Sequence, residues 1–344
     1  MRSETWQRLL SMETRDAVGA WHTRIFASEL NARRIKEITS SAKQAREFFR
    51  NSEGSDNSVK PLLSFYGVAS LSRATLLLLK KGSGEASLTP GHGIETVGWA
   101  TTLSGEISTG LTGLESLRIK TCGGLFSEFM RETNNRMCMH VNFSSVDWEI
   151  AYDLPLIGEE LTLGDLLSRI PDLLNEYKRI PRVSNHAYVN SMTYTEQDGF
   201  YARVNAKMFK TFQDSYEALG FSAKYDGDWC DVRASKEVFS AKPPQFMHTY
   251  INKTFGSIPT LQIVKPFESG TRYSQLAVTY LLSYCLGMLA RYFPTHWVSL
   301  FSADKGDRLW PVMNSAQKYI DTSYPELVVE LIHHTLDKSE QFGA

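Results

Sequence analysis

An arginine and a histidine at the end of a long apolar stretch are placed to act together on a phosphate ester. They are Arg291 and His296, in the stretch R-Y-F-P-T-H-W at residues 291–297. A histidine can exchange a proton with the 2′-hydroxyl of RNA or with the leaving oxygen, and an arginine can stabilise charge on the phosphate. Because this chemistry needs no metal, we predict Arg291 and His296 as a catalytic pair, with no metal and no other cofactor.

The spacing of Arg291 and His296 is only weak evidence for a catalytic pair, because a chain with 8 histidines is expected to contain similar spacings by chance. Two others are present, namely Arg15 with His22 and Arg179 with His186. Pro294 lies within the pair and favours a kink or a helix end. The alternative interpretation is therefore structural: Arg291 interacts with the carbonyls at a helix end, and His296 packs at the boundary.

A second candidate site is the loop K-P-F-E-S-G-T-R-Y-S at residues 265–274. Its Ser-Gly-Thr turn precedes a predicted helix, whose first N–H groups can bind phosphate. We predict ligand contacts from Lys265, Arg272 and Tyr273, with RNA or another nucleic acid as the ligand. The P-loop motif G-x-x-x-x-G-K-[ST] is missing, so ATP hydrolysis has no support. The alternative is a strand-to-helix connection in which a serine or threonine caps the helix.

Two more residues complete the predicted binding set. Arg73 lies inside the apolar segment 61–79, and His92 lies in P-G-H-G, where the glycines leave its ring free to approach a ligand. An isolated loop histidine is more often merely solvated, which is the alternative for His92. His140, near Cys138, suggests a metal ligand, but two donors without a second matching pair make a poor metal site.

The elements that must position these residues are helices near both ends of the chain and strands in its middle. Hydrophobic spacing predicts helices over residues 6–30, 35–48, 61–80, 271–293, 306–320 and 323–337. Alternation predicts strands within 116–146 and over 187–194, 200–204, 229–234 and 260–264. A helix within 162–177 is expected to break at Pro171, and residues 82–115 are rich in Gly, Ser and Thr and predict loop.

This order of elements predicts an α+β fold with a mainly α-helical core and a β-rich middle insertion. The predicted parts are residues 1–115 and 265–344, which form the helical core, and residues 116–264, which form the insertion. The two long apolar helices each contain Gly and Ser, which permit them to approach each other closely. We expect them to pack together.

Composition narrows the class of protein. The chain has 344 residues, 42% of them hydrophobic, and a formal net charge of −1, which argues against a generic nucleic-acid coat and permits a local basic cleft. The four cysteines form no C-x-x-C pair, as is typical of a reducing compartment. No signal peptide is evident, and the segments 61–79 and 276–290 are interpreted as buried helices rather than membrane spans. We therefore expect a cytoplasmic protein.

Four stretches resemble the YaaC-like proteins of bacteria. They are K-P-L-L-S-F-Y-G-V-A-S-L-S-R-A at 60–74, H-G at 92–93, K-P-F-E-S-G-T-R-Y-S-Q-L at 265–276 and M-L-A-R-Y-F-P-T-H-W at 288–297. The resemblance extends from about residue 25 to residue 337. It implies a cytoplasmic bacterial protein with an α-helical core similar to HEPN-type helical domains, whose ribonuclease members carry an R-x4–6-H pair.

Two hypotheses on function follow from the sequence. The first is a HEPN-like RNA-binding protein or metal-independent endoribonuclease, with a role in bacterial defence against phage. The second is a non-enzymatic protein that binds a protein partner or a ligand and whose arginines are structural. A homodimer is compatible with both hypotheses. The absence of G-x-S-x-G, H-E-x-x-H and G-x-G-x-x-G motifs disfavours familiar hydrolases and dinucleotide oxidoreductases.

Overall fold

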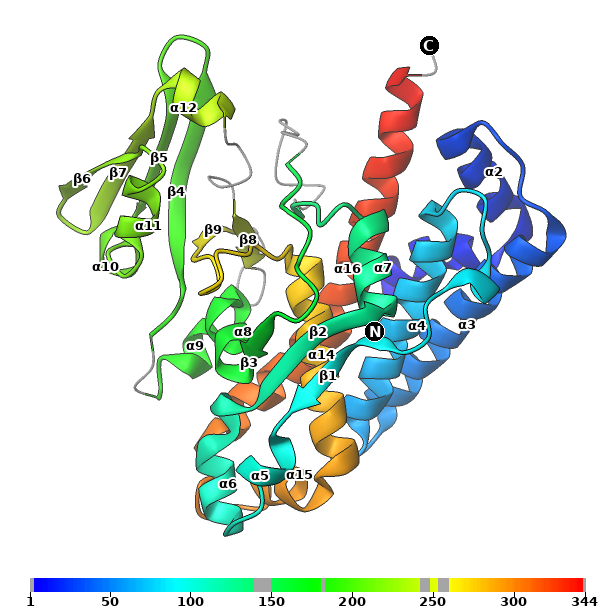
Figure 1. The fold of residues 1–344 in the computed structure, drawn as a ribbon, viewed down its shortest axis with the longest axis horizontal. Helices are drawn as coiled ribbons and strands as arrows, with labels where there is room; N and C mark the ends of the chain where they lie inside the picture. The colour runs from blue at the N-terminus through cyan, green and yellow to red at the C-terminus, as the bar shows by residue number, and fades with distance from the viewer. Residues whose placement is uncertain (1–2, 139–149, 181–182, 242–247, 253–259, 343–344) are drawn as a thin grey trace. The chain divides into compact units, whose positions relative to one another are not determined.

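The computed structural model describes residues 3–138, 150–180, 183–241, 248–252 and 260–342. Helices dominate both ends of the chain and strands dominate the middle, which confirms the predicted α+β class (Figure 1). The chain forms two compact units. Unit 1 comprises residues 1–134, 154–164 and 276–344, and unit 2 comprises residues 135–153 and 165–275. The observed boundaries fall near 135 and 275, where the sequence predicted 116 and 264.

Unit 1 is a helical core that carries a small antiparallel sheet. Its helices are α1 (Ser3–Leu9), α2 (Arg15–Phe26), α3 (Ala32–Gly54), α4 (Lys60–Leu79), α5 (Trp99–Thr102), α6 (Ile107–Gly113), α7 (Leu125–Glu132), α14 (Gln275–Tyr292), α15 (Pro294–Leu300) and α16 (Trp310–Phe342). Its strands are β1 (His92–Val97), β2 (Arg118–Gly124) and β3 (Glu160–Thr162), in the order β1-β2-β3.

The apolar helix α4 is the centre of unit 1. Pro61 occupies its first turn, where a missing N–H costs nothing, and most of its side chains are buried. A Cβ on Gly67 would lie 2.8 Å from the Phe49 ring of α3, and a Cβ on Gly287 of α14 would lie 2.7 Å from the Phe65 Cβ of α4. Glycine therefore lets α3 and α14 approach α4, and the predicted packing of the two apolar helices is confirmed.

The sheet of unit 1 begins inside a segment that the sequence predicted to be loop. Residues 92–97 form β1, which pairs with β2 through a bulge between His92 and Ile94. Gly124 adopts φ +147, and a Cβ there would lie 2.5 Å from the Gly93 nitrogen, so the two backbones meet where a side chain does not fit. The prediction of loop over 82–115 was therefore wrong for β1, α5 and α6, because their few apolar residues gain burial only from tertiary contacts.

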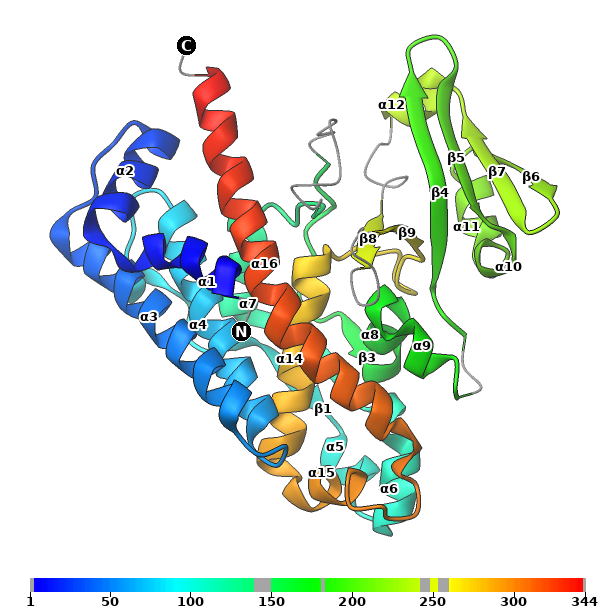
Figure 2. The same cartoon turned by 180° about the vertical axis from the view of Figure 1, so that it is seen from behind.

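The C-terminal helices agree with the prediction at Pro294, which favoured a kink or a helix end, and depart from it at Pro325. Helix α14 ends at Tyr292 and α15 begins at Pro294, and the two axes form an angle of 108°. Helix α16 instead runs without interruption through Pro325, where the sequence predicted two helices (Figure 2). A proline thus begins one helix and is accommodated inside another, which local sequence alone does not distinguish.

Unit 2 is built on an antiparallel sheet with the strand order β6-β7-β5-β4-β9-β8. Its strands are β4 (His186–Thr195), β5 (Gly199–Asn205), β6 (Ser222–Asp226), β7 (Trp229–Ala234), β8 (Thr249–Asn252) and β9 (Thr260–Val264). Its helices are α8 (Leu163–Arg169, which begins in unit 1), α9 (Leu174–Tyr177), α10 (Ala206–Phe209), α11 (Gln213–Glu217) and α12 (Lys236–Ala241). The predicted strands 187–194 and 200–204 are confirmed as the antiparallel neighbours β4 and β5, and the predicted break at Pro171 is confirmed.

Among the described helices, Lys60–Leu79 is long and apolar enough to cross a membrane. The bent pair of α14 and α15 passes the same test only if both helices are counted as one span. Within Lys60–Leu79, 78% of the most apolar window is buried inside the protein. Its apolar surface is therefore covered by the chain itself, in agreement with the predicted buried helix.

Candidate functional site

His92, at the start of β1, lies among aromatic rings from the two apolar helices of unit 1. Its ring centroid is 4.9 Å from that of Phe65 and 6.4 Å from that of Tyr66, both on α4, and 6.3 Å from that of Tyr284 on α14. The Tyr280 hydroxyl donates to the His92 carbonyl oxygen over 3.3 Å. The half-buried imidazole is thus held where α4, α14 and β1 meet.

Two arginines lie near enough to this histidine to lower the pKa of its imidazole. The Arg291 guanidinium donates to the Tyr66 hydroxyl over 2.8 Å and lies over the Tyr292 ring, 4.9 Å from its centroid. Arg73 forms an ion pair with Glu85 over 3.3 Å, and its Nε has no hydrogen-bond partner. The Arg73 Nε is buried, but the Arg73 side chain as a whole is 43% exposed and Arg291 is exposed, so both side chains are in contact with solvent.

The two arginines affect the histidine electrostatically. Burial lowers the pKa of His92 below its ordinary value of 6.5, and the positive charges of Arg291 and Arg73 lower it further. The imidazole is therefore neutral at pH 7, with a lone pair that can accept a proton. Two guanidinium groups near a neutral histidine can bind a phosphate group, and the histidine can exchange a proton with an oxygen of the phosphate ester.

Two half-buried aromatic rings, Phe48 and Tyr66, and one exposed ring, Tyr292, extend this surface. Phe48 on α3 stacks on Tyr66 with a centroid distance of 5.5 Å and an interplanar angle of 28°. Tyr292 is 59% exposed. We call the set of Phe48, Tyr66, Arg73, His92, Arg291 and Tyr292 the His92 surface. Basic groups beside exposed aromatic rings are typical of sites that bind single-stranded nucleic acids.

The structure brings three of the predicted site residues together and leaves His296 apart. Arg73, His92 and Arg291 share the His92 surface. His296, on α15, is only 8% exposed, and its ring lies against the backbone of Gly110. Its Nε2 is buried without a hydrogen-bond partner, and burial alone lowers its pKa. Arg291 thus influences His92 instead of His296, and this geometry favours the structural interpretation of His296.

The loop 265–274 is held within unit 2 by buried polar contacts. The Arg169 guanidinium donates to the Lys265 carbonyl oxygen over 3.0 Å and to the Pro266 carbonyl oxygen over 2.8 Å. Tyr273 is fully buried, and its carbonyl oxygen accepts from the Tyr250 hydroxyl over 2.7 Å. These contacts favour the alternative interpretation of the loop as a strand-to-helix connection, because the Tyr273 side chain does not reach the surface.

The other two predicted residues of this loop are half-buried. Lys265 donates its backbone N–H to the Asn185 carbonyl oxygen over 2.8 Å. Arg272 donates to the Gly270 carbonyl oxygen over 3.1 Å, and burial lowers its pKa. Its Nε is buried without a partner. Ligand binding by Lys265 and Arg272 stays a prediction.

Tyr66, which joins Arg291 to the aromatic cluster, was not among the residues predicted from the sequence. Tyr66 precedes Arg73 by seven residues on α4, a spacing that places both on one face of a helix. This spacing is the signal that links Tyr66 to a predicted site residue. The spacing becomes informative only when α14 and β1 are known to lie on the face of α4 that carries Tyr66 and Arg73.

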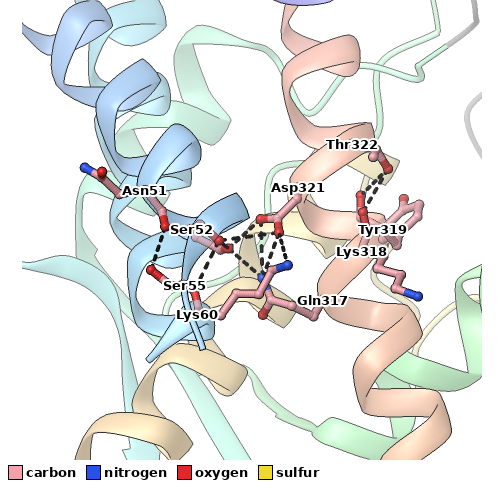
Figure 3. Close-up of polar contacts among 10 residues, drawn as sticks. Asn51, Ser52, Ser55, Lys60, Gln317, Lys318, Tyr319, Asp321 and Thr322 are labelled. Atoms are coloured by element: carbon pink, nitrogen blue, oxygen red, sulfur yellow. Dashed lines mark hydrogen bonds and ion pairs between the residues drawn. The ribbon is translucent and has the colours of Figure 1, made fainter. Parts of the chain in front are cut away.

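A second polar cluster lies inside unit 1, where α3, α4 and α16 meet (Figure 3). The Asp321 carboxylate accepts hydrogen bonds from Ser64, Ser52 and Gln317, and it lies 3.9 Å from the Lys60 ammonium. Burial raises the pKa of Asp321, and these partners oppose that shift. Because Ser52 and Ser64 are fully buried, this cluster joins helices and presents no serine to a ligand.

Within the part of the chain that the structure describes, no group of three or more His, Cys, Asp or Glu side chains is arranged to hold a metal ion. His140, which suggested a metal ligand, lies outside the described residues.

The chain belongs to the YaaC-like protein family, because the family model described as YaaC-like Protein matches residues 5–332. No curated protein and no solved structure matches the chain significantly. The family match carries no information on a HEPN-type core, so that part of the expectation stays a prediction.

Proposed function

We propose that this YaaC-like protein is a cytoplasmic RNA-binding protein that binds single-stranded RNA on the His92 surface. The observation that carries the proposal is the grouping of His92 with Tyr66 and Arg291, where the Tyr66 ring neighbours the His92 ring, stacks on Phe48 and accepts a hydrogen bond from Arg291. The arginines attract phosphates and the rings stack on bases, and neither interaction requires a particular sequence. Because the net charge of the chain is −1, binding has to come from this local surface.

Binding is tested by fluorescence anisotropy with a labelled single-stranded RNA. Arg291→Ala and Arg73→Ala are expected to weaken binding and to reduce the slope of log K against log salt by about 1 each. Arg15→Ala is the matched control, since Arg15 is an exposed arginine on α2 that contributes nothing to the His92 surface. Equal affinities of all four proteins would contradict the proposal and leave the alternative, a protein that binds another partner.

Metal-independent cleavage of the bound RNA is the second candidate function, favoured by the lowered pKa of His92. The neutral imidazole accepts the proton of a 2′-hydroxyl, the 2′-oxygen attacks the phosphorus and the P–O5′ bond breaks. The proton then passes to the 5′-oxygen, which leaves a 2′,3′-cyclic phosphate and a 5′-hydroxyl. Arg291 and Arg73 stabilise the negative charge of the pentavalent phosphate. Such a ribonuclease would suit a role in defence against phage.

Cleavage is tested with the same RNA, labelled at its 5′ end, in the presence of EDTA. Cleavage that is lost in His92→Ala and retained in His296→Ala supports His92 as the base. Loss in His296→Ala alone supports the pair that the sequence predicted, Arg291 with His296. Bound but intact RNA supports a binding protein without this enzymatic activity.

A further inference from the structure

The neighbouring strands β4, β5, β7 and β6 of unit 2 present two faces of different chemistry (Figure 1). On one face, side chains such as Ala202 of β5 and Val232 of β7 belong to a core cluster. The same cluster contains Phe209 of α10, Tyr216 of α11 and Phe239 of α12. Successive side chains of a strand point to opposite faces, so the residues between these core positions form the other face. We call it the Tyr201 face, and the residues that define its chemistry are Tyr188, Tyr201, Arg203, Lys224, Trp229 and Arg233.

The strand register places these side chains in rows across the sheet. Arg233 of β7 is directly opposite Tyr201 of β5. Asp231 of β7 is opposite Arg203 on β5 and opposite Lys224 on β6. Side chains that are directly opposite lie on the same face and contact each other. The Tyr201 face is therefore one continuous patch across three strands.

Aromatic rings and a guanidinium group supply stacking surfaces on this face. Tyr188, Tyr201 and Trp229 are half-buried, and Arg233 is exposed. The ring centroids of Tyr188 and Trp229 are 6.1 Å apart. The Arg233 guanidinium lies over the Tyr201 ring, 4.8 Å from its centroid, and this cation–π contact orients it. Unpaired bases stack both on aromatic rings and on arginine side chains.

The charges on the Tyr201 face leave a positive excess. The Arg203 guanidinium lies 3.0 Å from the Asp226 carboxylate and 3.4 Å from the Asp231 carboxylate. Lys224 and Arg233 are both exposed, and neither forms an ion pair with any described residue. The charges of these five side chains sum to +1, with the excess on Lys224 and Arg233. These two cations are therefore available to phosphate groups.

The composition of the Tyr201 face favours a nucleic acid over a protein partner. The outward side chains of β5, β6 and β7 include no Leu, Ile, Val, Met or Phe, whereas the centre of a protein–protein interface is typically apolar. The large apolar groups of this face are aromatic rings instead, beside the hydroxyl groups of Ser191 and Thr193 on β4. An antiparallel sheet with aromatic and basic side chains on its outward face is a typical surface for single-stranded RNA.

We propose that the Tyr201 face binds a single-stranded RNA segment. Bases stack on the Trp229 ring and on the Arg233 guanidinium above Tyr201, and Lys224 contacts a phosphate. Stacking requires unpaired bases, so the face selects single strands over a duplex. The Tyr201 face lies in unit 2 and shares no residue with the His92 surface of unit 1. Either surface can therefore bind RNA without the other.

The test is fluorescence anisotropy of the full chain with a labelled single-stranded RNA, and with the same RNA annealed to its complement. The single strand is expected to bind about tenfold more tightly than the duplex. Lys224→Ala is expected to reduce the slope of log K against log salt by about 1. Arg233→Gln is expected to weaken binding about tenfold, because a charge and a stacking group are lost. Lys207→Ala, which removes an exposed lysine of α10, is the matched control and should bind normally.

A photochemical crosslink identifies the surface that holds the RNA. On irradiation, 5-iodouridine within the RNA attaches to an aromatic side chain that it contacts, and mass spectrometry of the digested protein identifies that residue. Attachment to Tyr201 or Trp229 is expected. Attachment to Tyr66 or Tyr292 would instead report binding at the His92 surface.

The two RNA-binding proposals fail separately. Unchanged affinity in both Lys224→Ala and Arg233→Gln, or no attachment to the Tyr201 face, overturns the present proposal even if Arg291→Ala weakens binding. Weaker binding in these two variants with no effect of Arg291→Ala supports the Tyr201 face and contradicts the His92 surface. Equal affinity for the duplex overturns the stacking of bases on this face. Circular dichroism checks that each variant is folded.

Discussion

Arg291 lies close enough to His92 to lower the pKa of its imidazole, although the two residues are far apart in the sequence. Tyr66 connects them, because its ring neighbours the His92 ring and its hydroxyl accepts from the Arg291 guanidinium over 2.8 Å. The arginine that the sequence paired with His296 therefore acts on a different histidine. This relationship is the physical basis of the proposed RNA-binding surface.

The first prediction concerns the pKa of His92. In Arg291→Ala, it should rise toward 6.5 and remain below that value, because burial is the larger cause of the lowered pKa and persists. Arg73→Ala should act in the same direction and more weakly, since Arg73 is the smaller of the two charge effects. The measurement is an NMR titration of the histidine side chains.

His296 provides the internal control in the same titration. Burial alone lowers its pKa, so Arg291→Ala should leave that pKa unchanged. A shift of the His296 pKa together with an unmoved His92 would restore the pair that the sequence suggested, and would remove the basis of the His92 surface.

The second prediction uses the ion pair between Arg73 and Glu85, whose side chains are 43% and 47% exposed. Glu85→Gln removes a carboxylate that neutralises Arg73, so RNA should bind more tightly, by about threefold, as expected for one exposed charge pair. Arg73→Gln should change the affinity in the opposite direction. Both changes should shrink at high salt, because exposed charges are screened. An affinity that is the same in both variants would exclude Arg73 from the RNA contacts.

Much of the fold was predictable because its signals are local. The apolar run of α4 and the alternating strands around the turn of β4 and β5 define those elements by themselves. Strand β1 was missed because the segment around it is rich in Gly, Ser and Thr, and it gains order only by pairing with β2. Helix α16 continues through Pro325, since its packing outweighs one lost backbone hydrogen bond.

The candidate site was predictable only as separate residues. Arg73, His92 and Arg291 each stood out in the sequence, as an arginine in an apolar helix, a histidine between glycines and an arginine near a histidine. Which of them meet depends on the packing of α4 against α14, where Gly287 permits close approach to Phe65. That contact joins distant segments and has no local sequence signal. The spacing of Arg291 and His296 was local and suggested a different pairing.

The third prediction tests the structural role of His296 through Gly110. A Cβ at Gly110 would lie 2.7 Å from the His296 Nε2, so Gly110→Ala should lower the free energy of unfolding by about 1–3 kcal/mol, as overpacking does. His296→Ala should also destabilise the chain by about 1–3 kcal/mol, because it empties a buried site. The measurement is urea unfolding at pH 7.

The double variant decides whether the two residues are coupled. In the His296→Ala background, Gly110→Ala meets no ring, and alanine is better than glycine within a helix by up to about 1 kcal/mol. Gly110→Ala should therefore stabilise the chain in the His296→Ala background, whereas Gly110→Ala alone should destabilise it. The difference between these two effects is the coupling energy of the two residues. Additive losses would show that the ring does not fill the space beside Gly110.

The fourth prediction concerns Asp321, whose carboxylate lies between α3, α4 and α16 (Figure 3). Its side chain is 19% exposed, and burial raises its pKa above 3.8 in spite of the hydrogen bonds from Ser64 and Gln317. The protonated carboxyl group of Asp321 is thus more stable, relative to its ionised form, in the folded chain than in the unfolded chain. The associated stability is fully present below pH 3.8 and is lost as the pH rises through the folded pKa.

Asp321→Asn should remove this pH dependence, because the amide resembles the protonated carboxyl and cannot ionise. Its stability relative to the unmutated chain is therefore expected to increase as the pH rises from about 4 to 7, in urea unfolding curves measured at each pH. Asp337→Asn is the control, because this exposed aspartate lies on the same helix and takes no part in the Asp321 cluster. If Asp321→Asn instead loses stability relative to the unmutated chain as the pH rises, the hydrogen bonds and the charge of Lys60 outweigh burial. The cluster would then hold its carboxylate ionised, with the pKa of Asp321 below 3.8 instead of above it.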